Sequence, residues 1–230
     1  MGAGSLINLH THTRYSDGDF FPEEVVTRAA DDGLTHIAIT DHFETTKIRC
    51  LSSNAFSDYL SVIRSLQKKF KGGIDVLAGV EIDTNPARCD LGGLPFEKLN
   101  ELDLVLFEYV SDPVCGGIGL DDLEEILSQI SVPCGLAHTD IQRIFGERGP
   151  EETAELIASY GLFVEINTAY LYKREGSYFF ELAERFFQEF RGRVRISVGT
   201  DVHHSLSEIS NLRTAYGFIR RTGLETDLLF

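Results

Sequence analysis

Short apolar runs alternate with longer stretches in which apolar residues recur every three or four positions, and this pattern covers the whole chain. A short apolar run between turn residues is typical of a buried strand, whereas the longer period is typical of an amphipathic helix. Strands are predicted at residues 5–9, 35–40, 74–80, 102–107, 133–137, 162–166 and 194–199. Helices are predicted between them at residues 22–32, 54–70, 120–130, 151–160, 176–190 and 207–221.

This alternation is typical of repeated βα units that build a parallel sheet. Seven units in 230 residues average about 33 residues each, close to the length of one βαβ repeat. The connections that contain Gly, Pro and Asp are too short to separate domains. The sequence therefore predicts an α/β fold, a small (β/α)7 barrel, in a single domain that spans residues 1–230.

The acidic composition limits the partners that the chain can bind. Its 36 Asp and Glu outnumber its 21 Lys and Arg, and the formal net charge of -15 repels polyanions. No apolar segment approaches the roughly 20 residues of a membrane span, and a signal peptide is not apparent. The four cysteines are widely spaced without a CxxC pair, which indicates free thiols. We expect a cytoplasmic protein that binds neither long nucleic acid nor membranes.

Histidine and carboxylate side chains follow most of the predicted strands. His10 and His12 close the first run, and an extended backbone points residues i and i+2 to the same face. In a (β/α) barrel the loops after the strands converge on the active site, so we expect the polar residues there to meet. The further candidates at such positions are Asp17, His42, Glu81, His138, Asp201 and His203.

This set of side chains predicts a metal-dependent hydrolase. Neutral imidazole and carboxylate ligands suit Zn, Mn or Fe, and their number exceeds what one ion requires, so two or three ions are expected. Such a site activates water and can stabilise both the attacking and the leaving oxygen of a displacement at phosphorus. No GxSxG, P-loop or GxGxxG motif supports a serine hydrolase, an NTPase or a dinucleotide-binding protein.

The motifs HTHTRYSDG, GLTHIAITDH, GVEI, AHTD and GTDVHH, between residues 8 and 204, resemble in order those of the PHP family, the polymerase and histidinol phosphatase superfamily. The resemblance implies a distorted seven-stranded TIM-like barrel, a trinuclear metal site and phosphoester hydrolysis by a metal-bridging hydroxide. By position, the first ion is held by His10, His12, Glu81 and Asp201. Glu81 bridges to a second ion that His138 also binds, and the third ion is held by Asp17, His42 and His203.

One position departs from the family pattern. Where the family usually has a histidine after the fourth strand, this chain has Val110, so the second ion loses a ligand. Glu108, two residues earlier, is on the same face if the strand continues, and we include it among the candidate ligands. A structural role for this carboxylate remains an equal alternative.

Several other residues are candidates for substrate binding or support. Arg14, Lys173 and Arg174 are predicted to bind the phosphate of the substrate, because a guanidinium or ammonium group matches its charge. Asp201 and His203 are predicted to act in catalysis as well as in metal binding. Asp41 is expected to cap a loop or to orient a ligand. Glu165 and Asn167 are expected either to orient water or substrate or to make structural hydrogen bonds, and His36 and His204 are expected to be packing or surface residues.

The function predicted from these observations is hydrolysis of small phosphorylated metabolites or nucleotides. One alternative is another metal-dependent hydrolase barrel, an amidohydrolase or a TatD-like deoxyribonuclease, since these also begin with HxH on the first strand. A second alternative is a degenerate barrel that binds a metal or a partner without catalysis, and Val110 is its main support.

Overall fold

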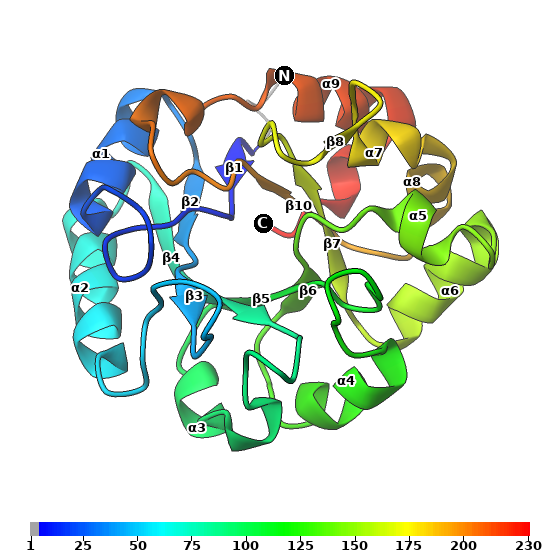
Figure 1. The fold of residues 1–230 in the computed structure, drawn as a ribbon. Coiled ribbons are helices and arrows are strands. Elements are labelled where there is room, and N and C mark those ends of the chain that lie inside the picture. The colour runs from blue at the N-terminus through cyan, green and yellow to red at the C-terminus, as the bar shows by residue number, and fades with distance from the viewer. Residues whose placement is uncertain (1–4) are drawn as a thin grey trace.

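Seven parallel strands form a nearly closed barrel in the computed structural model, which describes residues 5–230 (Figure 1). In their order around the barrel they are β1 (Ile7–Asn8), β2 (His36–Ile39), β4 (Asp75–Asp83), β5 (Leu104–Glu108), β6 (Cys134–Leu136), β7 (Phe163–Asn167) and β10 (Ile196–Gly199). The short strand β3 (His42–Phe43) pairs with β4 beyond the end of β2. The backbone amide of Leu9 donates to the carbonyl of Val198 at 2.7 Å, so the first and last strands meet. The predicted (β/α)7 barrel is confirmed.

Helices surround this ring of strands (Figure 1). They are α1 (Pro22–Asp31), α2 (Phe56–Lys69), α3 (Phe96–Leu99), α4 (Leu120–Leu127), α5 (Ile141–Phe145), α6 (Pro150–Ser159), α7 (Phe179–Leu182), α8 (Glu184–Phe190) and α9 (Arg213–Thr222). An antiparallel hairpin, β8 (Lys173–Arg174) and β9 (Ser177–Tyr178), precedes α7. Among the residues that the structure describes, no helix is long and apolar enough to cross a membrane.

The apolar pattern explains how each layer packs. Leu104, Val105, Leu106 and Phe107 of β5 are all buried, as expected for a parallel strand covered on both faces. On α9 the buried residues recur every three or four positions, so one face of the helix packs against the barrel. These buried residues are Ala215, Phe218, Ile219 and Thr222.

Two predicted helices begin later than expected. The stretch 176–190 starts with the β8–β9 hairpin, in which Gly176 takes a positive φ of 84° that favours glycine, and is then divided into α7 and α8. The stretch 207–221 becomes helical only at Arg213, after a short 3-10 turn, Leu206–Glu208. Ser210 and Asn211 precede this start, and their side chains favour turns over a helix interior.

The last residues cover the amino-terminal end of the barrel. The amide of Leu229 donates to the carbonyl of Ile196 at 2.9 Å, at the start of β10. The ring of Phe230 stacks on His36, the first residue of β2, with 5.8 Å between ring centroids. This arrangement leaves the carboxyl ends of the strands, at the opposite end of the barrel, as the place where loops converge.

A tyrosine of α2 connects the helix to β2 and β4 by hydrogen bonds, and its hydroxyl allows their contribution to stability to be tested. The buried Tyr59 hydroxyl lies 2.9 Å from the carbonyl oxygen of Ile39 and 2.6 Å from that of Gly79. We predict that Tyr59→Phe lowers the free energy of unfolding by about 1–2 kcal/mol, because buried carbonyls lose a donor. Urea unfolding followed by circular dichroism measures this change. Tyr170→Phe, at an exposed position, is the control, and equal stability of both variants would contradict the prediction.

Candidate metal centre

The chain segments that follow β1 and β10 run side by side and bring the first ligands together. The amide of Asp201 donates to the carbonyl of His10 at 2.9 Å, and the amide of His12 donates to the carbonyl of Val202 at 2.9 Å. Asp201 itself has a positive φ of 50°, a strained conformation for a residue other than glycine. The pairing therefore fixes the backbone from which these side chains point into the barrel.

The long strand β4 supplies the central carboxylate. Glu81 lies two residues before the end of this strand, beyond the end of β2, where β3 takes over the pairing. The register pairs His42 directly with Glu81. His42 Nδ1 consequently lies 3.0 Å from Glu81 Oε2.

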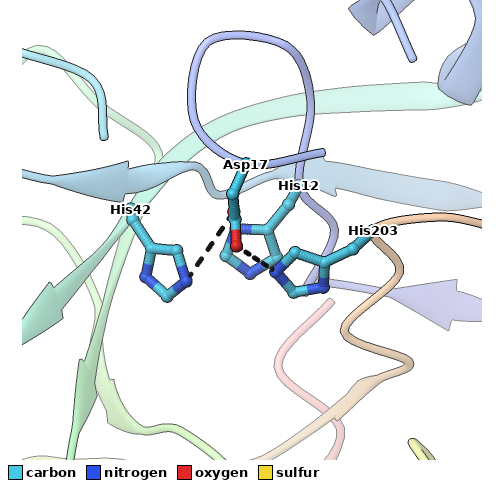
Figure 2. A group of neighbouring side chains, drawn as sticks. All are labelled: His12, Asp17, His42 and His203. Atoms are coloured by element: carbon cyan, nitrogen blue, oxygen red, sulfur yellow. Dashed lines mark ion pairs between the residues drawn. The ribbon is translucent and has the colours of Figure 1, made fainter. Parts of the chain in front are cut away.

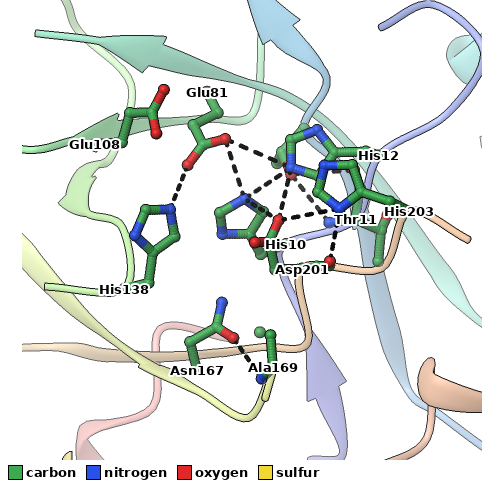
Figure 3. Close-up of polar contacts among 12 residues, drawn as sticks. His10, Thr11, His12, Glu81, Glu108, His138, Asn167, Ala169, Asp201 and His203 are labelled. Atoms are coloured by element: carbon green, nitrogen blue, oxygen red, sulfur yellow. Dashed lines mark hydrogen bonds and ion pairs between the residues drawn. The ribbon is translucent and has the colours of Figure 1, made fainter. Parts of the chain in front are cut away.

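One group of four donors comprises His10, His12, Glu81 and Asp201 (Figure 3). His12 Nε2 lies 2.9 Å from Asp201 Oδ1 and 3.5 Å from Glu81 Oε2. His10 Nε2 lies 3.3 Å from Asp201 Oδ1 and 3.4 Å from Glu81 Oε2. One donor atom from each residue lies within 4.8 Å of all the others, which is compatible with a shared ion. This is the set that the PHP resemblance implies for the first ion.

A second group lies on the other side of His12 and comprises His12, Asp17, His42 and His203 (Figure 2). Asp17 is in its centre, with Oδ2 3.3 Å from His203 Nε2 and Oδ1 3.9 Å from His42 Nε2. His12 Nδ1 lies 3.8 Å from Asp17 Oδ1. The group contains the three residues implied for the third ion and adds His12.

The residues implied for the second ion are arranged differently. His138 Nε2 lies 2.8 Å from Glu81 Oε1, but His138 belongs to none of the groups of three or more donors found in residues 5–230. The third such group is instead His42, Glu81 and Glu108. In that group Glu108 already has a cationic neighbour, because both of its carboxylate oxygens contact Lys47 Nζ, at 2.5 and 2.8 Å.

Unpaired buried atoms indicate that the site suits cations. Glu81 Oε2, Asp201 Oδ1 and His42 Nδ1 are buried and have no hydrogen-bond partner among the residues that the structure describes. Burying polar atoms without partners is costly. The two carboxylate oxygens face the first group, whereas His42 Nδ1 faces Glu81 and Glu108, at 3.0 and 3.8 Å, in the third group. The mixture of imidazole nitrogen and carboxylate oxygen fits Zn, Mn or Fe. The residues present therefore fit bound divalent ions.

The charges of the site support the same assignment. Burial, together with the neighbouring His42, lowers the pKa of His12 to about 3, so its imidazole is neutral and can ligate metal at neutral pH. Burial opposes ionisation of Asp201, yet the neighbouring His10 and His12 hold its pKa well below the ordinary value. The carboxylate is therefore charged and available as a ligand.

Glu165 on β7 orients two candidate ligands through hydrogen bonds to His10 and His138. Its Oε1 accepts a hydrogen bond from His10 Nδ1 at 2.9 Å, and its Oε2 accepts from the backbone amide of His138 at 2.6 Å. Because a carboxylate only accepts, His10 Nδ1 carries a proton, and Nε2 is the nitrogen that would ligate an ion. Asn167 donates to Glu165 Oε1 at 3.0 Å. Glu165 and Asn167 thus form a hydrogen-bonded pair that holds two candidate ligands in place.

Asp41 holds the loop that carries Asp17. Its Oδ1 accepts from the backbone amides of Thr13 and Ser16, at 2.7 and 3.1 Å. Its carboxylate also accepts from the hydroxyl groups of both residues. This is the loop-capping role expected from the sequence.

The three predicted phosphate-binding cations lie away from these groups. Arg14 donates to the carbonyl of Asp19, and Lys173 lies over the ring of Tyr178 at 4.2 Å from its centroid. Arg174 donates to Asp140 at 3.0 Å. Within residues 5–230, none of the three cations forms a hydrogen bond or ion pair with a candidate metal ligand. Their role in substrate binding stays a prediction.

Two residues near the site were not anticipated from the sequence. Tyr172 stacks its ring on His138, with 4.1 Å between centroids, and its hydroxyl donates to Asp201 at 2.5 Å. Lys47 reaches Glu108 from the loop after β3. Neither residue follows a strand at a fixed spacing, so no sequence signal marked them. The only indication for Lys47 was indirect: Glu108 ends a buried strand, and a buried carboxylate requires a partner.

A cavity of about 230 Å³ opens beside His138. Its walls include the aromatic residues Tyr109, Tyr172 and Phe179, and the buried Val110 lines it as well. The charged side chains in its lining, Asp112, Asp140 and Arg143, are engaged in ion pairs. The cavity thus provides a mostly apolar and aromatic space next to the metal ligands.

Comparison with known families decides what this barrel is. The PHP domain model matches residues 8–169, more than half of the chain. The chain belongs to the PHP domain family. The resemblance found in the sequence motifs is thereby confirmed, and the barrel can be compared with other PHP proteins.

Curated relatives are distant but extend over most of this PHP chain. An uncharacterised protein of Methanocaldococcus jannaschii is 27% identical over 206 residues, which cover 85% of this chain and 80% of that protein. A probable histidinol-phosphatase of Deinococcus radiodurans is 24% identical and covers 71% of this chain and 74% of that protein.

Solved structures show the same fold. The histidinol phosphate phosphatase of Lactococcus lactis, crystallised with zinc, L-histidinol and phosphate, superposes with a TM-score of 0.65 and 20% identity. The matched region covers 95% of this chain and 94% of that structure. A structure described as a putative histidinol phosphatase of Listeria monocytogenes has a TM-score of 0.58 and 16% identity, and the match covers 91% of this chain and 99% of that structure.

The role of Glu165 gives a test of the centre. We predict that Glu165→Gln weakens Zn²⁺ binding roughly 10- to 100-fold, because a neutral amide holds His10 less firmly and supports its basicity less. Competition with a fluorescent chelator measures the affinity. Glu184→Gln on the outer helix α8 is the matched control, and identical affinities of the two variants would contradict the orienting role.

Proposed function

We propose that this PHP protein is a metal-dependent phosphoesterase that hydrolyses small phosphorylated metabolites or nucleotides. The observation that carries the proposal is the pair of donor groups that share the buried His12, at the carboxyl ends of the barrel strands. This is the end of a (β/α) barrel where active sites are found. Membership of the PHP family and the histidinol phosphatase neighbours support a hydrolase.

The donor groups would hold two or three divalent ions, Zn, Mn or Fe. When bound, such ions supply a water-derived nucleophile at neutral pH and neutralise charge on the phosphoryl group. Glu165 keeps His10 in the tautomer that can ligate. Asp41 holds the backbone of the loop that carries Asp17.

We assign Asp201 and His203 to catalysis as well as to metal binding. Asp201 accepts a hydrogen bond from Tyr172, which lines the cavity, so it connects the donor groups to the space for substrate. The His203 side chain is 19% exposed and therefore within reach of a substrate. Burial and the neighbouring Asp201 hold the pKa of Tyr172 well above its ordinary value, so the phenol keeps its proton as a donor.

The size and the charge of the molecule favour small substrates. A cavity of about 230 Å³ holds a compact leaving group, and aromatic walls favour one with a flat or apolar part. The net charge of -15 disfavours a long polyanion. Arg174 is the best placed of the predicted phosphate-binding cations, because its partner Asp140 lines this cavity.

We place the protein in the cytoplasm, which is consistent with four free cysteines.

The decisive test is turnover. We predict that protein loaded with Zn²⁺ or Mn²⁺ releases phosphate from members of a panel of phosphomonoesters and nucleotides. His12→Ala should lower kcat/KM at least about 100-fold, because removing a metal ligand weakens the site more than removing a residue that only orients a ligand. His36→Ala is the matched control, since His36 lies at the amino-terminal end of the barrel. No turnover by fully metallated wild-type protein would contradict the proposal.

The non-catalytic reading is the second candidate, because Val110 replaces the family's histidine and Lys47 contacts Glu108. It predicts metal binding without turnover, and His10→Ala would then change only stability. The PHP match favours a phosphoesterase over an amidohydrolase or a TatD-like nuclease.

A further inference from the structure

Lys47 places an ammonium group among the candidate metal ligands. Its Nζ lies 2.5 and 2.8 Å from the two carboxylate oxygens of Glu108 and 3.2 Å from the hydroxyl of Tyr109. The three N–H groups of the ammonium thus have three acceptors. The ring of Tyr109 also lies 4.9 Å from Nζ, close enough for a cation–π contact. The lysine side chain is only 23% exposed, so it is held in the site.

Glu108 needs this cation. Its side chain is 2% exposed at the end of β5, and Oε1 lies 3.8 Å from His42 Nδ1. A buried carboxylate is stable only with a cation or several donors beside it. Figure 3 shows Glu108 beside Glu81, so two carboxylates lie close together here. In the trinuclear arrangement that the PHP resemblance implies, a divalent ion would balance such a pair, whereas here Lys47 contributes a positive charge.

The remaining ligands for an ion at this place are incomplete. His138 Nε2 lies 2.8 Å from Glu81 Oε1, but within residues 5–230 His138 belongs to no group of three or more donors. Val110 is fully buried and offers no donor atom. An ion bound by His42, Glu81 and Glu108 would have to approach an ammonium group that already contacts Glu108. A divalent ion and an ammonium group that share one buried carboxylate would repel each other strongly.

We propose that the Lys47 ammonium replaces one metal ion, so that the centre of this chain binds two ions, with Glu108 as the counter-ion of the lysine. The two ions are those of the groups that share His12. Lys47 is then a fixed positive charge, present at any metal concentration, on the side of the site nearest Tyr109 and the cavity. The inference rests on the proposed metal centre but is independent of turnover.

Metal stoichiometry tests the proposal. Full-length variants are loaded with excess Zn²⁺, desalted and analysed by plasma mass spectrometry, with folding checked by circular dichroism. We expect two ions per wild-type chain. Lys47→Met frees Glu108 and should raise the count to three, whereas the double variant Lys47→Met with Glu108→Gln should return it to two. Lys71→Met, at an exposed turn after α2, is the matched control and should bind two ions.

A second variant keeps the test decisive if Lys47→Met does not fold. Val110→His restores the family's histidine but keeps the ammonium group, and it should still bind two ions. Three ions on the wild-type or Val110→His chain, or two on a folded Lys47→Met chain, would overturn the proposal. Hydrolysis by a wild-type chain with three ions would refute this inference alone. Two ions without hydrolysis of any phosphoester would refute the proposed function alone.

Discussion

The centre depends on one buried carboxylate surrounded by imidazoles. The two oxygens of Glu81 lie between 2.8 and 3.5 Å from ring nitrogens of His10, His12, His42 and His138. These histidines come from β3 and from the segments after β1 and β6, so this one side chain joins distant parts of the chain. The length of β4 makes it possible, because the strand runs beyond β2 and carries Glu81 among the loops. Burying this carboxylate without a neighbouring cation would cost free energy. The surrounding imidazoles and the ions that they could hold offset that cost.

The positions of most candidate ligands follow from strand periodicity and barrel geometry. The spacing of His10 and His12 and the placing of Glu81 and Asp201 near strand ends suffice to predict that their donor atoms meet. The strands were predicted well because buried parallel strands are short apolar runs. Two helices started later than predicted, since Gly176 and the polar residues before Arg213 favour turns that a periodic pattern does not reveal.

The remaining parts of the site depend on loops that periodicity does not describe. Lys47 and Tyr172 reach the centre because their loops fold back over the barrel, and such paths are set by tertiary contacts rather than by local sequence. The same limit applies to Arg14, which follows HTHT in the sequence. In the structure it donates to the carbonyl of Asp19, and its role in substrate binding stays a prediction.

The left-handed backbone of two candidate ligands has a consequence for the evolution of this chain. His138 and Asp201 have φ values of 35° and 50°, which cost about 1–3 kcal/mol each for residues other than glycine. Glycine at either position would relieve this strain while removing a donor atom. Stability and metal binding therefore oppose each other there. Selection for thermal resistance alone would tend to erode the centre, so keeping these residues requires selection on the function itself.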